Sequence, residues 1–103
     1  MSYASSYSGN EKQFVYLVEG TSSEGRLIKI GHSWNVVVRL GQLRRSMGLS
    51  EIRVIKQKRY NYYSAIEKEK TIHRRLREYA VGPRSEWYWF NESVISVWNE
   101  VCK

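Results

Sequence analysis

Two charged residues, Glu69 and Arg39, occupy positions where helix-period patterns place apolar side chains. Apolar and aromatic residues recur at three-and-four spacing from Tyr62 to Ala80, and Glu69 and His73 fall on that same face. Arg39 belongs to a second, shorter stripe within Val36–Met47. A buried ionised carboxylate is costly unless a cation, a metal ion or several donors compensate it. We therefore expect Glu69 to have such a partner, and Arg39 to point at the core or just beside it.

These residue types suit the chemistry of phosphate groups. A hard cation such as Mg²⁺ takes oxygen ligands and keeps several waters, so one inward carboxylate together with substrate phosphate oxygens can hold it. The guanidinium of Arg39 offers a planar fork of donors to phosphate oxygens and stays protonated throughout a reaction. The structural alternative is a buried salt bridge between Arg39 and Glu69, which would cost roughly 3–5 kcal/mol to break.

Length and charge narrow the class of protein. The chain has 103 residues, enough for one small core but not for separate catalytic and recognition domains. Seventeen Lys and Arg against ten Asp and Glu give a net charge of +7, which favours nucleic acid as partner. A soluble domain with a merely basic surface is the alternative.

The cysteine content and the hydropathy of the sequence indicate in which cellular compartment we expect the protein. Cys102 is the single cysteine, so the sequence has neither a disulfide framework nor a zinc motif. No apolar run approaches the roughly 20 residues of a membrane span, and the first ten residues have no hydrophobic signal region. We expect a cytoplasmic protein without a membrane partner, in the host cytoplasm if a phage encodes it.

The segment order predicts one α+β domain at 13–103 after a flexible leader at 1–12. The sheet is expected to be small and mainly antiparallel, with three to four strands flanked by helices. The predicted elements are a hairpin of Phe14–Val18 and Leu27–Gly31 around a Gly20–Gly25 turn, a helix capped by Ser33 or Asn35 and ended by Gly48, a strand Glu51–Tyr60, a helix Tyr62–Ala80, a short strand or packed segment Glu86–Phe90, and a final helix from Asn91 to Val101.

Four short motifs follow one another along these elements: Val15-Tyr16, Lys29-Ile30-Gly31, Arg39 eight residues after that glycine, and Glu69 on the long helix. This series resembles the GIY-YIG nuclease superfamily. The stretches IKIGHSWNVVVRLGQL, AIEKEKTIHRRL and SEWYWF are similar to its phage- and virus-borne branch, in which the second motif reads KIG. The likeness spans about Phe14 to Phe90.

The resemblance implies a GIY-YIG-like fold and hydrolysis of a phosphodiester with one divalent cation, Mg²⁺ or Mn²⁺. It places Tyr16 near the attacking water, Arg39 on the phosphate and Glu69 as the metal ligand. A phenol normally titrates near 10, so Tyr16 can act as a base only if its pKa is lowered. We favour Tyr16 as the group that positions the water, and DNA over RNA as substrate.

The sequence also departs from the superfamily pattern. Phe14 stands where the first motif begins with glycine, and Lys29 replaces the tyrosine of the second motif. Lys29 could hold a phosphate or, with a lowered pKa, accept a proton. His32 and His73 are candidates for a proton shuttle or a phosphate contact; for His73 the alternative is a core histidine bonded to a backbone carbonyl. Asn91 is not assigned to the site, because it also fits a helix cap.

Basic residues interleaved with tyrosines surround these motifs and suit phosphate contacts with base stacking. The candidate nucleic-acid-binding residues are Arg44, Arg45, Lys56, Lys58, Arg59 and Arg74, with Arg75 and Arg77 beside them. A solvated helix face is the alternative for the arginines after His73. Trp87 and Trp89 are expected to pack in the core, whereas Trp34 suits either role.

Three hypotheses follow. The first is a small stand-alone endonuclease whose specificity is low or comes from a homodimer or a partner protein. The second is a catalytically inactive module of the same fold that binds nucleic acid or inhibits a partner protein. The third is a scaffold in which Arg39 and Glu69 only pair with each other.

Overall fold

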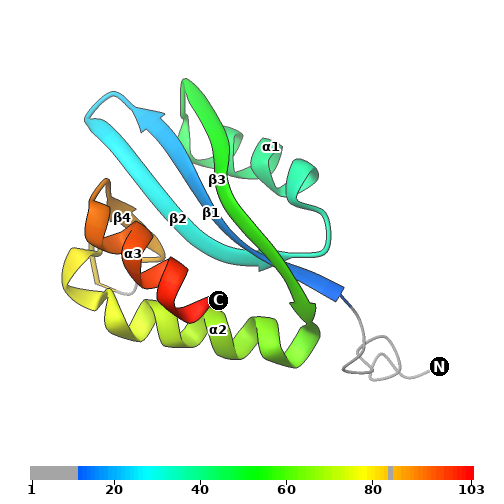
Figure 1. The fold of residues 1–103 in the computed structure, drawn as a ribbon. Helices are drawn as coiled ribbons and strands as arrows, with labels where there is room; N and C mark the ends of the chain where they lie inside the picture. The colour runs from blue at the N-terminus through cyan, green and yellow to red at the C-terminus, as the bar shows by residue number, and fades with distance from the viewer. Residues whose placement is uncertain (1–11, 84) are drawn as a thin grey trace.

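The computed structural model describes residues 12–83 and 85–103, and the predicted leader up to residue 11 lies outside them. Figure 1 shows a small antiparallel sheet flanked by helices, the α+β class that the sequence predicts. The elements are β1 (Lys12–Ser22), β2 (Gly25–Ser33), α1 (Val36–Met47), β3 (Glu51–Asn61), α2 (Tyr62–Arg75), a 3₁₀ turn (Arg77–Tyr79), β4 (Trp87–Trp89) and α3 (Glu92–Val101). The strand order is β3-β1-β2-β4.

The hairpin is longer than its apolar core suggests. β1 starts at Lys12, a residue assigned to the leader from sequence, and only Ser23 and Glu24 separate β1 from β2. The predicted turn at Gly20–Gly25 is therefore too long, because Gly20, Thr21 and Ser22 all pair with β2. Gly25 ends the turn with φ 140°, a conformation that glycine adopts without steric cost.

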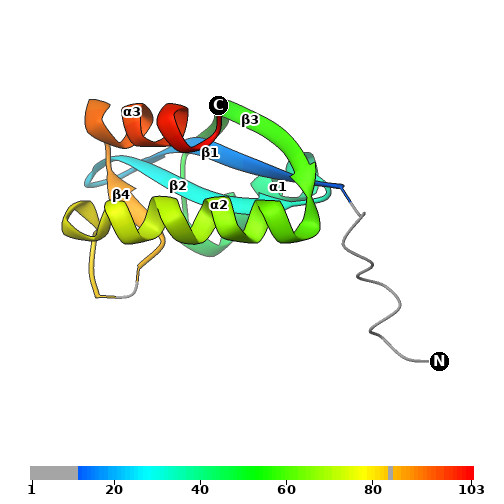
Figure 2. The ribbon, with the colours of Figure 1, turned by 60° about the horizontal axis from the view of Figure 1, so that its bottom comes forward.

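Both faces of the sheet are covered, which explains why four consecutive residues of β1, Val15 to Val18, are buried. On one face Val15 and Leu17 pack with residues of α2 and α3 such as Ile72 and Trp98. On the other face Tyr16 and Val18 pack against α1. Figure 2 shows α2 and α3 beside the sheet from a second direction.

Asparagine side chains start all three α-helices. Asn35, one of the two residues predicted to cap α1, accepts a hydrogen bond from Val38 N. Asn61 and Asn91 cap α2 and α3 by accepting hydrogen bonds from Ser64 N and Ser93 N. Gly48 ends α1 in the left-handed conformation, φ 61°, which confirms its predicted role.

The long helix was predicted to reach Ala80, and this was wrong by one turn and a half. α2 ends at Arg75, and a 3₁₀ turn follows. Ala80 is already extended and forms an isolated bridge with Tyr88. Strand pairing at this point outweighs the helical period of the sequence.

The aromatic segment forms β4, a three-residue strand along β2. Trp87 is buried, as expected. Trp89 is 42% exposed, so the prediction that it packs in the core is wrong. Trp34 is 73% exposed. Within the described residues, no helix combines the length and apolarity that crossing a membrane requires.

A buried carboxylate links the turn end of the β1–β2 hairpin to β3. Glu19 is only 6% exposed, and its two oxygens accept hydrogen bonds from Arg26 and Arg53. The hydrogen bond from Arg26 is the main cause that holds the pKa of Glu19 below its ordinary value, against the opposing effect of burial.

Glu19 should make stability depend on pH. A carboxyl group whose pKa is lower in the folded state stabilises the fold when the pH is above its pKa in the unfolded state. This stabilisation is lost as the pH falls through its pKa in the folded state. We expect Glu19→Gln to lower the free energy of unfolding by about 1–3 kcal/mol at neutral pH and to flatten its decline in acid. Urea unfolding at several pH values measures this, with Glu24→Gln in the exposed turn as control. Equal acid sensitivity of wild type and Glu19→Gln would contradict it.

Candidate active site at the edge of β2

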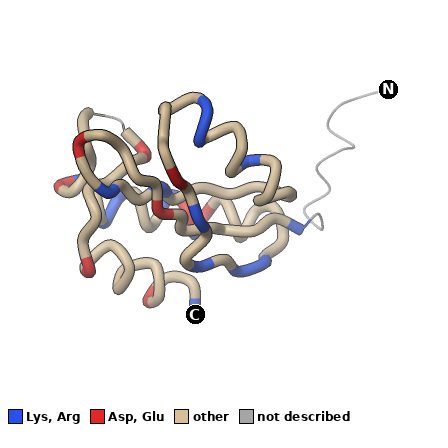
Figure 3. The backbone as a smooth tube through the Cα atoms, turned by 90° about the horizontal axis from the view of Figure 1, so that it is seen from above, with Lys and Arg blue, Asp and Glu red and all other residues tan. Residues whose placement is uncertain are grey.

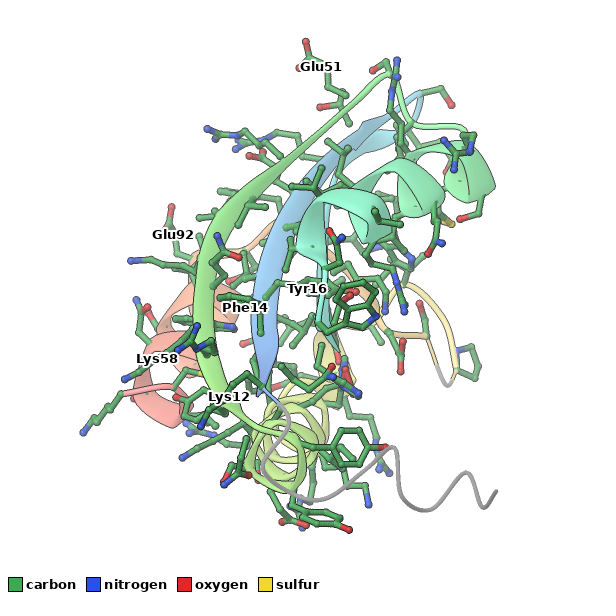
Figure 4. All side chains as sticks on the ribbon, turned by 90° about the vertical axis from the view of Figure 1, so that its right-hand side faces the viewer. Lys12, Phe14, Tyr16, Glu51, Lys58 and Glu92 are labelled. Carbon is green, nitrogen blue, oxygen red and sulfur yellow. The ribbon has the colours of Figure 1, made fainter. Side chains whose placement is uncertain are left out.

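The predicted site residues meet at the outer edge of β2. β4 pairs with β2 only from Leu27 to Lys29, so among the described residues no strand pairs with the outer edge of β2 from Ile30 onward. Tyr16 comes from the α1 face of the sheet (Figure 4), and Glu69 comes from α2 on the opposite face. Two such side chains can approach each other only around an edge, and this is the edge that β4 leaves open.

Gly31 lets Tyr16 reach that edge. Tyr16 and Gly31 are opposite each other in the β1–β2 ladder, and the phenol ring lies across the glycine. A Cβ atom at Gly31 would lie 2.7 Å from Tyr16 Cζ and closer still to the hydroxyl. The glycine of the second motif therefore provides the space through which the tyrosine of the first motif crosses β2.

The hydroxyl of Tyr16 lies among the charges that the sequence assigns to the site. Burial is the main cause that raises the pKa of Tyr16 to about 12. The charge and hydrogen bond of Arg39 act in the opposite direction, whereas the carboxylates of Glu69 and Glu86 add to the rise. Tyr16 is therefore a neutral phenol near pH 7, which fits a water-positioning group better than a base.

Glu69 is turned inward, with its side chain 16% exposed, and accepts a hydrogen bond from His32 Nδ1 at 3.2 Å. A histidine of β2 is therefore one partner of this carboxylate. Arg39 is exposed on α1, but its guanidinium reaches the hydroxyl of the buried Tyr16. Its side chain therefore lies beside the core, one of the two positions that the sequence predicts. Among the ion pairs of the described residues there is no Arg39–Glu69 pair, which removes the basis of the scaffold hypothesis.

His73 uses both ring nitrogens. Its Nε2–H donates to the carbonyl oxygen of Ile30 at 3.1 Å, so Nδ1 accepts a hydrogen bond from the Tyr88 hydroxyl. Burial is the main cause that lowers the pKa of His73 and keeps the ring neutral, which agrees with this arrangement. The hydrogen bond to the Ile30 carbonyl is the contact expected if His73 is a core histidine and not a proton shuttle.

Lys29 is buried and forms an ion pair with Glu86. Its Nζ atom lies 2.5 Å from Glu86 Oε1, with the lysine side chain 8% exposed and the glutamate 55% exposed. Burial opposes ionisation of Glu86, but the hydrogen bond and charge of Lys29 outweigh it and lower the pKa of this carboxyl group. Lys29 thus brings a positive charge to the site. Its ammonium group is bound by Glu86, which is 57 positions later in the chain.

Three potential metal ligands converge at this place. One ligand atom each from Glu69, His73 and Glu86 lies within 4.8 Å of the other two. Carboxylate oxygens are the donors that Mg²⁺ and Mn²⁺ prefer, so the two glutamates fit such an ion. His73 could join them only by giving up its hydrogen bond to Ile30 or to Tyr88.

The cluster opens into a cavity of about 1120 Å³ between α2 and the segment that leads to β4. Of the six predicted nucleic-acid-binding residues, Arg74 lines this cavity. Arg44 lies in a separate pocket with Glu19, and Lys58 lies over the ring of Tyr60. Arg59 is opposite Phe14 on β1, and Arg45 approaches Gly41 within α1. Lys56 of β3 is opposite Leu17 of β1. Figure 3 shows that Lys and Arg are spread over several elements.

Sequence reasoning missed two residues of this site. Glu86 was noticed only as part of the SEWYWF stretch, and Tyr88 was counted as an aromatic packing residue. Their contacts with Lys29 and His73 depend on β4 pairing with β2, a long-range contact for which periodicity gives no signal. A glutamate directly before a buried aromatic strand was the available hint.

Comparison with known proteins places this arrangement in a family. The family model of the T5orf172 domain matches residues 13–103. The chain belongs to the T5orf172 domain family, a phage-associated family related to GIY-YIG/HNH-type nuclease-like folds. This class is compatible with a nuclease-type enzyme or a DNA-binding phage domain. Searches of curated proteins and of solved structures gave no match.

Substitution of Gly31 tests the crossing of Tyr16 over β2. We expect Gly31→Ala to cost about 1–3 kcal/mol, the range for overpacking, because the buried phenol must move. Gly41→Ala is the control, since a Cβ atom there lies 3.4 Å from the end of the Arg45 side chain and alanine favours a helix. Thermal unfolding and the environment of the Tyr16 ring by NMR measure the two effects. A Gly31→Ala variant with wild-type stability and spectrum would contradict the prediction.

The Lys29–Glu86 pair should respond asymmetrically to removal of its partners. Glu86→Ala leaves a buried ammonium without its carboxylate, for which we expect a loss of about 1–3 kcal/mol or more. Lys29→Met leaves a half-exposed carboxylate that water can solvate, so the loss should be smaller. Chemical denaturation of both single variants and the double variant measures the coupling. Equal losses would show that burial of Lys29 is not the dominant cost.

Proposed function

We propose that the chain is a GIY-YIG-type nuclease of the KIG branch that hydrolyses phosphodiester bonds of nucleic acid, DNA in preference to RNA, with one divalent cation. The observation that carries the proposal is the convergence of the Tyr16 hydroxyl, the Arg39 guanidinium and the Glu69 carboxylate at one sheet edge. Membership of a phage family related to nuclease-like folds supports it.

Each residue has a role that follows from its contacts. Arg39 would bind a non-bridging oxygen of the scissile phosphate and stabilise the charge that grows there. Tyr16, a neutral phenol, would orient the attacking water. Lys29 would add a fixed positive charge opposite the phosphate, with Glu86 holding the ammonium in place.

Glu69 would hold Mg²⁺ or Mn²⁺, and Glu86 is the second carboxylate within reach. Such an ion would polarise a phosphate oxygen and neutralise part of its charge. His32 donates to Glu69 through Nδ1, so its second ring nitrogen is available for proton transfer. His73, with both nitrogens engaged, would position the β2 edge and Tyr88. In this proposal the protein acts alone or as a homodimer, or takes its specificity from a partner protein.

Glu69→Gln tests this function. We expect it to reduce plasmid nicking in Mg²⁺ or Mn²⁺ by more than about a hundredfold, because the charge that holds the cation is lost. Stability should stay equal or rise, since charged sites carry a stability cost. Nicking with each cation and with a chelator, calorimetric titration of Mn²⁺ and thermal unfolding are the measurements.

Glu67→Gln is the matched control, because Glu67 is exposed on another side of α2. If wild type binds DNA but cleaves neither DNA nor RNA with either cation, the nuclease proposal is wrong and the inactive binding module is favoured. If Glu69→Gln keeps its activity, the role of Glu69 is wrong.

A further inference from the structure

The cavity beside the glutamates has a cationic wall that the proposed reaction does not use. Lys70, Arg74 and Arg77 line it together with Glu69, His73 and Glu86. Lys70 and Arg74 are four residues apart and lie on one stripe of α2, and Arg77 follows in the 3₁₀ turn after the helix ends. This stripe lies directly beside the stripe of Glu69 and His73.

These three cations have no carboxylate partner within the described part of the chain. The only polar contact of the Arg74 guanidinium there is Thr71 Oγ1, at 3.5 Å. Some basic residues of the described chain have a carboxylate partner: Arg75 pairs with Glu100, Arg26 and Arg53 pair with Glu19, and Lys29 pairs with Glu86. The basic residues of α1, and those of β3 other than Arg53, form no such pair, but they do not line this cavity. The cavity therefore combines uncompensated positive charge with open space.

Charge and volume indicate the kind of ligand. Three cations face two carboxylates in the cavity, and a divalent ion on those carboxylates would make the surplus of positive charge larger. A volume of about 1120 Å³ exceeds what a single ion needs and reaches the size of small-molecule sites. The same cavity is lined by Glu69 and Glu86, the two carboxylates that the proposed function assigns to the cation.

We propose that Lys70, Arg74 and Arg77 form a backbone-binding subsite that holds the phosphates next to the scissile one, so that the strand leaves the site along α2. This subsite rests on the proposed nucleic-acid partner but not on cleavage. It places phosphate binding in the cavity that adjoins Glu69 and Glu86. Its contacts are to phosphates, so they carry no sequence preference.

Arg75 provides a matched control inside the same helix. Arg74 and Arg75 are adjacent arginines, but only Arg74 lines the cavity, whereas Arg75 binds Glu100 of α3. Arg74→Ala and Arg75→Ala therefore remove the same charge from almost the same place in the sequence. Arg77→Ala and Lys70→Ala test the two other members of the subsite.

The experiment measures binding of fluorescein-labelled DNA, single-stranded and duplex, by anisotropy in chelator, where no cleavage is expected. We expect Arg74→Ala and Arg77→Ala each to weaken binding and to reduce the slope of log Kd against log salt by about 0.9 for duplex. Arg75→Ala should leave the slope unchanged. Circular dichroism and thermal unfolding confirm that each variant is folded.

Equal effects of Arg74→Ala and Arg75→Ala would overturn the subsite, since net charge alone would then explain binding. Failure of the wild type to bind either DNA would overturn it as well. If binding shows the expected pattern but no cation supports cleavage, the subsite stands and the nuclease proposal fails. The two proposals are thus separable.

Discussion

The whole site depends on a shortfall in pairing at one edge of the sheet. β4 covers β2 for three residues and then ends, so the carbonyl group of Ile30 must find a donor elsewhere. His73 of α2 supplies it, which brings α2 against the open edge and carries Glu69 with it. A longer β4 would pair with the rest of β2 and close this edge, around which groups from the two faces of the sheet meet.

Close packing then decides which side chains enter this gap. Gly31 removes the one Cβ atom that would block the Tyr16 phenol, and burial keeps that phenol neutral. Glu86 forms an ion pair with Lys29, because a buried ammonium group is costly without a nearby carboxylate. Tyr88 satisfies the second nitrogen of His73. Each polar group at the edge has a partner from another element, so the site is also a junction that ties α2 and β4 to the hairpin.

Much of this architecture can be predicted from the sequence, because local rules dominate it. The asparagine caps, the left-handed Gly48 and the alternation in β1 follow from backbone chemistry, and the inward Glu69 follows from helical period. The end of α2 and the role of Glu86 do not, since both depend on β4 pairing with β2 across a long stretch of chain. The apolar stripe of α1 locates Arg39 only approximately. The residue lies on an exposed helix face, and its long side chain still reaches Tyr16.

The Lys29–Glu86 pair has a consequence for how the site is assembled. The groups at the β2 edge come from residues as early as Tyr16 and as late as Tyr88, which span most of the chain. During synthesis Lys29 cannot pair with Glu86 until the segment that leads to β4 has left the ribosome. The hydrogen bonds and ion pair at the β2 edge are therefore complete only after Tyr88 has been synthesised.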